Sequence, residues 1–453
     1  MIFLFLHNQK PISMKNLKRF LFLLLIIIIV AVVYNYPKLN ILAGYSAKST
    51  ASSVFLADRN LAYTDKTDNN FSPINLADDE VNETEKSATS SAFGLLTRKA
   101  FYRKGLGAVL ALDNEDLAQT YLSPKRAIAD NIAPFPYGNA EQKDTVFSNV
   151  DYTKLSKTLN VLFDSVNQTR AAVVVYKNQI IAERYANGFT KNSKLLGWSM
   201  TKSIVSTLFG VLEHQNKINV QSKDLFVEWR NDERKDITIH NLLQMNSGLE
   251  WVEDYNTISD VSKMLFLEKD MTKPQIDKPL MGKPNETWNY SSGTTNLLSG
   301  ILRNQFNTHQ EYLDFWYTDL IDKIGMNSMV VEADLAGNYV GSSYGWATAR
   351  DWSKLGLLYL NNGNWNGEQL FSKEWAKYAT TPTPTSNGEY GAQIWLNAGG
   401  KYPNVPKTMY SFNGYQGQYV FILPEQDLVI VRMGLTKNAD LDALLSGIIS
   451  SIK

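Results

Sequence analysis

The sequence predicts an α+β fold whose sheet is completed by segments far apart in the chain. Strand-like patterns occur at two places: residues 171–185 form one group, and residues 391–396, 419–423 and 428–433 form the other. The segment between them, from Ser199 to about Leu370, has the pattern of helices and loops. We therefore expect both groups of strands to share one sheet, with the helices inserted between them.

The first group of strands is the clearest. Residues 171–176 are apolar or aromatic, Lys177 and Asn178 make a short connection, and residues 179–185 follow as a return strand. Two such runs joined by two residues are typical of a β-hairpin. We expect the main domain to begin shortly before this hairpin, near Tyr152. A last helix is expected over 440–452.

A strongly apolar run near the N-terminus predicts a membrane segment. Residues 20–33 are almost wholly Leu, Ile, Val and Phe, with three basic residues within 15–19 and two tyrosines within 34–36. The run is short for a spanning helix, which needs ~17–25 residues, but its flanks are those of a membrane anchor with an exported body. A cleaved signal peptide is the alternative, although no small-x-small cleavage site follows closely.

These patterns divide the chain into three parts. Residues 1–37 are an N-terminal tail and hydrophobic anchor or signal, and residues 38–150 are a membrane-proximal region of unknown role. Apolar pieces at 92–96 and 107–112 predict a few strands in that region. Residues 151–453 form the main domain.

The composition narrows the function classes. Lysine and arginine together number 45, as do aspartate and glutamate, and this balance argues against nucleic acid as a partner. The chain has no cysteine and no His-Glu-x-x-His segment, so we expect neither a metal nor an organic cofactor. The expected partners are a small-molecule substrate and, through the N-terminal segment, a membrane; the oligomeric state stays open.

The most specific feature is Ser199-Met200-Thr201-Lys202, which begins an apolar helical run. Positions i and i+3 share one face of a helix, so Lys202 can lie beside the Ser199 hydroxyl. A serine nucleophile needs a neighbouring base, and burial lowers the pKa of a lysine enough for that task. The alternative is that Ser199 only caps a core helix while Lys202 is solvated.

Two later segments carry groups that would complement this pair. Tyr290 has a hydroxyl that both donates and accepts, so it can pass a proton to a leaving group. Gly417 and Gln418 lead into the strand over 419–423, where a backbone N–H can face an oxyanion. Taken singly, each is an ordinary loop tyrosine or turn.

Together and in this order, the segments resemble the serine β-lactamase and penicillin-binding-protein superfamily, whose first signature is Ser-x-x-Lys. The resemblance extends from about Ala171 to Val431, and residues 198–203, 253–255 and 290–292 are most similar to the branch of 6-aminohexanoate-dimer hydrolases and related esterases. It implies a β-lactamase/transpeptidase-like fold: an antiparallel sheet flanked by helices, plus a mostly helical subdomain.

The resemblance also implies roles for single residues. Ser199 would be the nucleophile, Lys202 its base and Tyr290 the proton relay. The N–H groups of Ser199 and Gln418 would form the oxyanion hole. The candidate substrate-binding residues are Tyr255, Ser292, Tyr415 and Gly417.

Two departures from the superfamily pattern bear on the substrate. Ser292 stands where asparagine is usual, and Tyr415 stands where lysine or histidine is frequent. Both changes remove polar groups that hold β-lactams and peptidoglycan stems. We therefore expect a serine hydrolase of the bacterial cell envelope that cleaves an amide or ester through an acyl-enzyme, anchored in the inner membrane or, after signal cleavage, periplasmic or secreted. A penicillin-interactive D,D-peptidase or β-lactamase and a non-catalytic membrane-anchored binding or sensor protein remain as alternatives.

Overall fold

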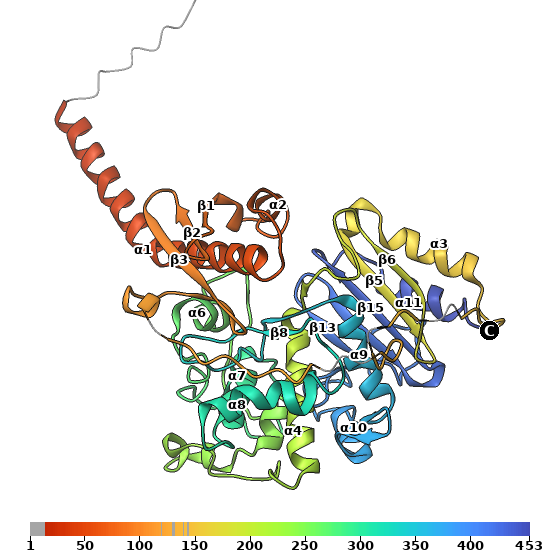
Figure 1. The fold of residues 1–453 in the computed structure, drawn as a ribbon. Helices are drawn as coiled ribbons and strands as arrows, with labels where there is room; N and C mark the ends of the chain where they lie inside the picture. Colours follow the sequence, from red (N-terminus) through yellow and green to blue (C-terminus); the bar gives the residue numbers. More distant parts are fainter. Residues whose placement is uncertain (1–13, 119, 129–131, 139, 143–144) are drawn as a thin grey trace, which may run out of the picture.

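The large sheet confirms the α+β prediction. In the computed structural model, six antiparallel strands lie in the order β12-β13-β14-β15-β5-β6. Strand β5 (Thr169–Tyr176) pairs with β15 (Leu428–Gly434), so the two ends of the domain share one sheet (Figure 1). The hairpin from β5 to β6 (Gln179–Tyr185) turns at Lys177 and Asn178, whose φ angles of 47° and 61° are those of a mirror-image hairpin turn.

The C-terminal strands differ in part from the prediction. Strand β14 (Gln418–Leu423) lies where it was expected. Strand β12 is only Trp395–Leu396, because residues 391–394 form a turn that contains the buried Gln393. Strand β13 (Tyr410–Gly414) was not predicted. Its serine, asparagine and glycine have low strand propensity, so pairing with its two neighbours decides its conformation.

Helices cover both faces of the large sheet (Figure 1). Helix α9 (Ala349–Leu360) packs on one face, against β14, β15 and β5. Helices α3 (Tyr152–Leu162) and α11 (Leu441–Ile449) contact each other and cover the opposite face. Alternate residues of β5 join the apolar clusters on the two sides, which explains why this strand is continuously apolar.

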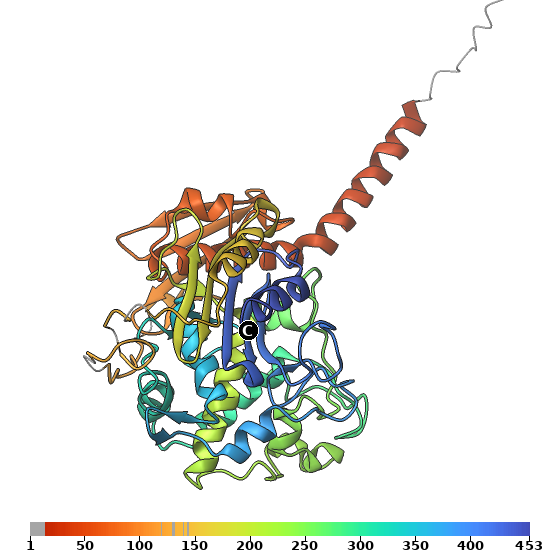
Figure 2. The same cartoon turned by 90° about the vertical axis from the view of Figure 1, so that its right-hand side faces the viewer.

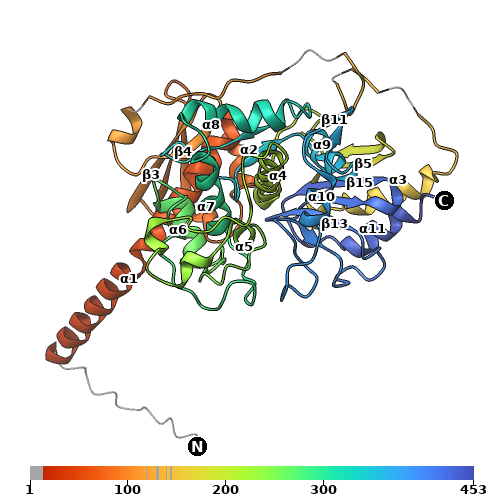
Figure 3. The same cartoon turned by 90° about the horizontal axis from the view of Figure 1, so that it is seen from below.

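A helical region lies beside the sheet, with the buried helix α4 between the two (Figure 3). Its main helices are α4 (Thr201–His214), α5 (Ile239–Leu243), α6 (Asp260–Leu267), α7 (Ser292–Arg303) and α8 (His309–Trp316). The shorter elements of the domain are β7 (Leu195–Leu196), β8 (Val330–Val331), β9 (Gly345–Ala347), β10 (Asn364–Trp365), β11 (Glu368–Gln369) and α10 (Lys373–Ala379).

The N-terminal helix α1 (Met14–Phe55) projects from the body and then enters it without a break (Figure 2). Its first part is exposed, and its second part packs on an antiparallel sheet. The strands of this sheet are β1 (Ala77–Asn82), β2 (Ser87–Ala92), β3 (Leu96–Arg103) and β4 (Gly107–Leu110), and the short helix α2 (Leu61–Lys66) precedes them. We call α1 residues 39–55 and the chain to residue 110 the N-terminal subdomain.

Three expectations about the N-terminal half need correction. The boundary between 37 and 38 is wrong, because α1 crosses it and Pro37, whose φ suits a helix, lies inside. The strand expected at 92–96 is the turn between β2 and β3. Residues 38–150 are not one unit, because after β4 the chain runs along the helical region, where Arg126 pairs with Asp322 at 2.6 Å.

The structure describes residues 14–118, 120–128, 132–138, 140–142 and 145–453. The N-terminal tail expected over 1–13 therefore lies outside the described residues.

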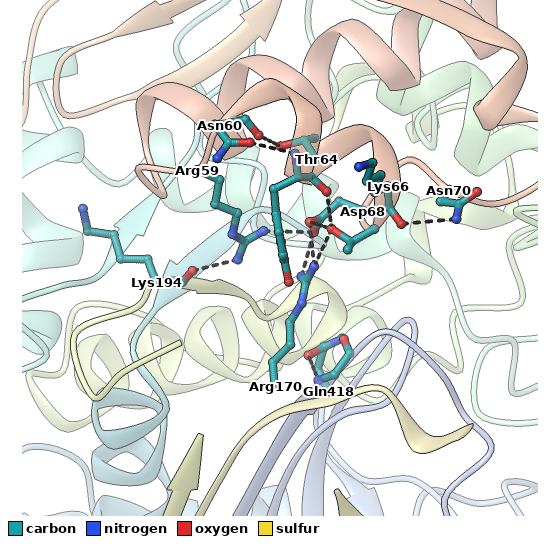
Figure 4. A network of polar contacts seen from close by, with 12 residues as sticks. Arg59, Asn60, Thr64, Lys66, Asp68, Asn70, Arg170, Lys194 and Gln418 are labelled. Carbon is teal, nitrogen blue, oxygen red and sulfur yellow. Dashed lines mark hydrogen bonds and ion pairs between the residues drawn. The ribbon is translucent and has the colours of Figure 1, made fainter. Parts of the chain in front are cut away.

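Buried ion pairs join the N-terminal subdomain to the main domain (Figure 4). Asp68, in the chain after α2, bonds Arg59 at 2.9 Å and Arg170 of β5 at 2.6 Å. Burial alone would raise the pKa of Asp68, but the two guanidinium groups outweigh it and hold that pKa well below its usual range. Lys48 of α1 pairs with Glu332 of the main domain at 2.5 Å. We call this set of contacts the junction.

Candidate active site

Ser199 lies in a short 3-10 turn (Trp198–Met200) that leads directly into α4, at the helix N-terminus that the sequence predicted. The Trp352 ring packs directly against Gly197, which precedes the turn. A Cβ at position 197 would lie 2.2 Å from that ring, so there is no space for a side chain there. Trp198 has a φ of 48°, which is uncommon for a bulky residue. Its ring is fixed among four tyrosines, namely Tyr45, Tyr255, Tyr344 and Tyr415.

Lys202 is buried beside the serine rather than solvated. Its Nζ lies 3.0 Å from Ser199 Oγ, 2.9 Å from Ser292 Oγ and 2.8 Å from the carbonyl oxygen of Ser342. Burial lowers the pKa of Lys202 to about 8, while the charge of Glu253 acts in the opposite direction. The amine can therefore exist in its neutral form near physiological pH.

Tyr290 lies on the other side of this pair, just before α7. The Lys202 Nζ is 5.0 Å from the centre of its ring, and the ring packs against Trp395. Burial and the charge of Glu253 raise the pKa of Tyr290 well above its usual range, although a hydrogen bond with Ser199 acts against them. The phenol therefore keeps its proton, and Tyr290 lines the same cleft as Ser199.

Glu253 is a site residue that the sequence did not single out. Its carboxylate accepts hydrogen bonds from the Ser292 N–H (2.9 Å), the Ser292 hydroxyl (2.5 Å) and the Trp251 indole (2.7 Å). The Tyr255 hydroxyl adds a longer contact of 3.3 Å. Trp251, Glu253 and Tyr255 are spaced two residues apart, and the fold brings their side chains together through these hydrogen bonds.

A cleft of about 690 Å³ opens over Ser199. Tyr290, Tyr255 and Tyr415 line it, and the last two rings stack with their centres 4.9 Å apart. Asn413 also faces the cleft, and its side-chain oxygen has no hydrogen-bond partner among the described residues. Further aromatic and cationic side chains line the outer part, namely Trp395, Tyr402, Tyr419, Lys401 and Lys437.

Three predicted site residues lie elsewhere. Ser292 is fully buried behind Lys202, so it contacts the lysine amine and does not line the cleft. Gly417 has a φ of 82° and lies against the Arg432 guanidinium. Gln418 bonds the backbone of Gly434 through both its side-chain oxygen and nitrogen, and it lines a small cavity at the junction near Arg170 (Figure 4).

Strands β13 and β14 both contact the turn that carries Ser199, and β13 has the more extensive contact. A Cβ at Gly414 would lie 2.1 Å from the carbonyl oxygen of Gly197, so the end of β13 touches the serine turn. Residues 415–417 then reverse the chain, and Gln418 begins the return strand opposite Gly414. The sequence analysis considered only the entry to β14 as a neighbour of Ser199, because β13 was not predicted.

These features define a class. A Ser–Lys pair at the start of a buried helix, between an antiparallel sheet and a helical region, is the arrangement of the serine β-lactamases and penicillin-binding proteins. The beta-lactamase family model matches residues 166–441. The chain belongs to this family and is a serine hydrolase.

Individual relatives agree with this assignment. The 6-aminohexanoate-dimer hydrolase of Paenarthrobacter ureafaciens is 23% identical over an alignment of 303 positions, and the match covers 60% of this chain and 74% of that protein. A solved Bacillus anthracis structure, provisionally assigned as a 6-aminohexanoate-dimer hydrolase, has a TM-score of 0.55 at 22% identity, covering 65% of this chain and 80% of its own. A penicillin-binding protein homologue from Caulobacter crescentus has a TM-score of 0.53 at 14% identity, covering 66% and 97%.

Proposed function

We propose that the protein cleaves an amide or ester bond of a small molecule through an acyl-enzyme on Ser199. The observation that carries the proposal is the Lys202 amine, which is buried 3.0 Å from the serine oxygen with its pKa lowered to about 8. A neutral amine at that distance can remove the serine proton as the oxygen attacks the substrate.

The hydrogen bonds around Lys202 direct its lone pair toward Ser199. The Ser292 hydroxyl donates its proton to Glu253, so it can only accept from the amine. The carbonyl of Ser342 also can only accept. These two acceptors take both N–H bonds of a neutral amine, and the remaining lone pair faces the serine hydroxyl. Glu253 is therefore a positioning residue that acts through Ser292.

The later steps use the groups around the cleft. As Ser199 attacks, negative charge develops on the substrate oxygen, and we assign its stabilisation to the N–H groups of Ser199 and Tyr415, the latter in place of Gln418. Removing one such donor typically costs ~3 kcal/mol in the transition state. Tyr290 passes a proton to the leaving group, and water then releases the acyl group from the serine.

The lining of the cleft favours an amide over a β-lactam. Asn413 lines the cleft and its side-chain oxygen is buried without a partner, so a turn of the carboxamide toward the substrate would let that oxygen accept the N–H of a secondary amide, a group that the ring nitrogen of a β-lactam lacks. Ser292 is buried and cannot replace the asparagine that would hold a penicillin side chain. The two relatives described as 6-aminohexanoate-dimer hydrolases, whose name denotes an amide substrate, agree with this preference.

We further propose that α1 is an uncleaved anchor in the inner membrane of a bacterium, with the hydrolase domain outside the cytoplasm. Helix α1 is long and apolar enough to span a membrane. Residues 42–48 of the same helix are buried in the body, so a signal peptidase cut shortly after the apolar run would fall in or beside the folded core.

Intact-mass analysis of the full chain in detergent tests the hydrolase proposal. The purified protein and its Ser199→Ala variant are each exposed to a p-nitrophenyl ester, a short amide and a penicillin, and released product is measured in the same samples. We expect an acyl adduct or product that depends on Ser199 with the ester and the amide. A stable adduct with penicillin alone would favour the penicillin-interactive alternative. Product and adduct independent of Ser199 would favour the binding or sensor protein.

A further inference from the structure

An exposed apolar patch lies at one end of the small sheet of the N-terminal subdomain. Its members are Phe93 and Leu95, at the turn between β2 and β3, and Leu76, which precedes β1. Their side chains are 57%, 62% and 49% exposed. Large apolar side chains that protrude together from a turn usually contact an apolar partner. We call these three residues the turn patch.

The turn patch lies next to the point where α1 leaves the body. Ala92 and Leu96, on either side of the turn, pack in one small cluster with Leu39, Leu42 and Ala43 of α1. Ala77, the neighbour of Leu76, pairs with Ala92 and joins the same cluster. The turn patch is therefore beside the first buried turn of the helix, and the exposed apolar part of α1 begins just before it.

Hydrogen bonds fix the sheet to the helix at this level. The Arg98 guanidinium of β3 donates to the side-chain oxygen of Asn40 at 3.2 Å and to the carbonyl oxygen of Phe266 at 3.1 Å. Since Arg98 is on the strand that begins at the turn, the turn patch cannot move independently of α1. Its height above the membrane therefore follows from the position of the helix.

We propose that the turn patch inserts into the interfacial layer of the same bilayer that α1 enters; this inference rests on the proposed anchor. From Tyr36, the second of the two tyrosines that follow the apolar run, to Ala43, beside the turn, α1 rises about 10 Å. The headgroup region occupies about 5–7 Å on each side of the hydrocarbon core, and the side chains of Phe93 and Leu95 extend from the turn. Aromatic and leucine side chains are those that bind at this depth.

A second membrane contact would have a consequence for the enzyme. A body held by one helix is free to rotate about the helix axis, whereas two adjacent contacts fix its orientation. The Ser199 cleft would then face a constant direction relative to the bilayer. The stacked rings of Tyr45 on α1 and Trp198 beside the nucleophile, 6.2 Å apart, connect the anchor helix to the serine turn.

Site-specific fluorescence in the full chain tests the proposal, because the protein has no cysteine of its own. Single cysteines replace Phe93 or Leu95 and are labelled with bimane, and the protein is reconstituted into phosphatidylcholine–phosphatidylglycerol vesicles. Some of the lipids carry a nitroxide near the headgroup or, in a parallel sample, at the middle of an acyl chain, and either nitroxide quenches bimane on contact. Ile27→Cys, within the apolar run, is the positive control. Val161→Cys, equally exposed on the distant helix α3, is the negative control (Figure 1).

We expect loss of most of the fluorescence at 93 and 95, as at 27, and little loss at 161. Quenching at 27 without quenching at 93 and 95 would overturn this inference and leave the anchor intact. No quenching at 27 would instead contradict the anchor on which the inference rests. A blue shift at 93 that appears without nitroxide quenching and grows with protein concentration would assign the turn patch to a second copy of the chain and overturn the membrane contact.

Discussion

A lysine is buried at the junction and another beside the cleft, but the two amines differ in how they contact the nearest carboxylate. At the junction, Lys48 contacts the Glu332 carboxylate directly at 2.5 Å and the Ser52 hydroxyl at 2.9 Å. Behind the cleft, the Ser292 hydroxyl lies between Lys202 and Glu253 and bonds both. Burial lowers the pKa of both amines. Glu332 acts against this lowering at Lys48 through both its charge and a direct hydrogen bond, whereas Glu253 acts on Lys202 through its charge alone.

The acceptor atoms of the two regions differ in the same way. Both carboxylate oxygens of Asp68 are filled by Arg59, Arg170 and Thr67 (Figure 4). Asn413 lines the cleft, and its side-chain oxygen is buried without a partner among the described residues. Because leaving a buried acceptor unpaired costs free energy, a molecule tends to retain one where a ligand will fill it.

The largest expected effect comes from exchanging each lysine for methionine. Lys202→Met removes the base, so kcat/KM for a p-nitrophenyl ester should fall by about 10²–10⁴-fold while the fold is retained. Lys48→Met leaves Glu332 buried without its cation, so the free energy of unfolding should fall by about 3–5 kcal/mol with kcat/KM unchanged in the folded protein. Denaturant titration and ester hydrolysis measure the two. Equal loss of activity in both folded variants would refute the distinction between the lysines.

Glu253→Gln tests the directing role of the carboxylate. An amide places a donor against the Ser292, Trp251 and Tyr255 donors, so the Ser292 hydroxyl loses its orientation and kcat/KM should fall by roughly 10–100-fold. Because the charge of Glu253 raises the pKa of Lys202, the acidic limb of the pH profile should also move to lower pH. A purely structural role would lower activity without moving that limb. Glu250→Gln removes the same charge outside this network and is the matched control.

The pH dependence sharpens the same comparison. With a Lys202 pKa of about 8, kcat/KM should rise with pH below that value, about tenfold per unit, and level off above it. The sign for stability follows from the same shift: between pH 8 and about 10.4 the unfolded lysine binds the proton that the folded one has lost, so the contribution of Lys202 to stability rises with pH there. Lys202→Met should remove this dependence in unfolding titrations. A rate profile independent of pH from 6 to 9 would contradict a lysine base.

The parts of this comparison that sequence could reveal are the local ones. Ser199 and Lys202 were found together because a helix brings positions i and i+3 to one face. Strands β5, β14 and β15, which lie near the two ends of the domain in sequence, were found because their apolar runs are continuous. Glu253 was missed because its partner Ser292 is distant in the chain, and only the fold brings the two together.

The remaining errors have similar causes. Strand β13 has little strand propensity and forms because β12 and β14 pair with it, so the sequence did not reveal that the end of β13 touches the serine turn. The boundary expected after residue 37 failed because a proline usually ends a helix pattern, whereas here the apolar flank of α1 packs on a sheet just beyond it.

The smallest expected effect concerns Asn413, whose unpartnered side-chain oxygen lies at the wall of the cleft. If Asn413 accepts the N–H of a bound amide, Asn413→Ala should lower kcat/KM for an amide by roughly 5–10-fold, the value of one hydrogen bond. The matched ester, which has the same acyl group but no N–H, should be hydrolysed at nearly the unchanged rate. An equal decrease for both substrates would mean that the substitution disturbs β13 and the Tyr415 N–H beyond it, because that donor serves amides and esters alike. The ratio of the two rates therefore separates recognition of the leaving group from stabilisation of the oxyanion. Only recognition of the leaving group would distinguish the cleft from the junction, where both oxygens of Asp68 already have partners.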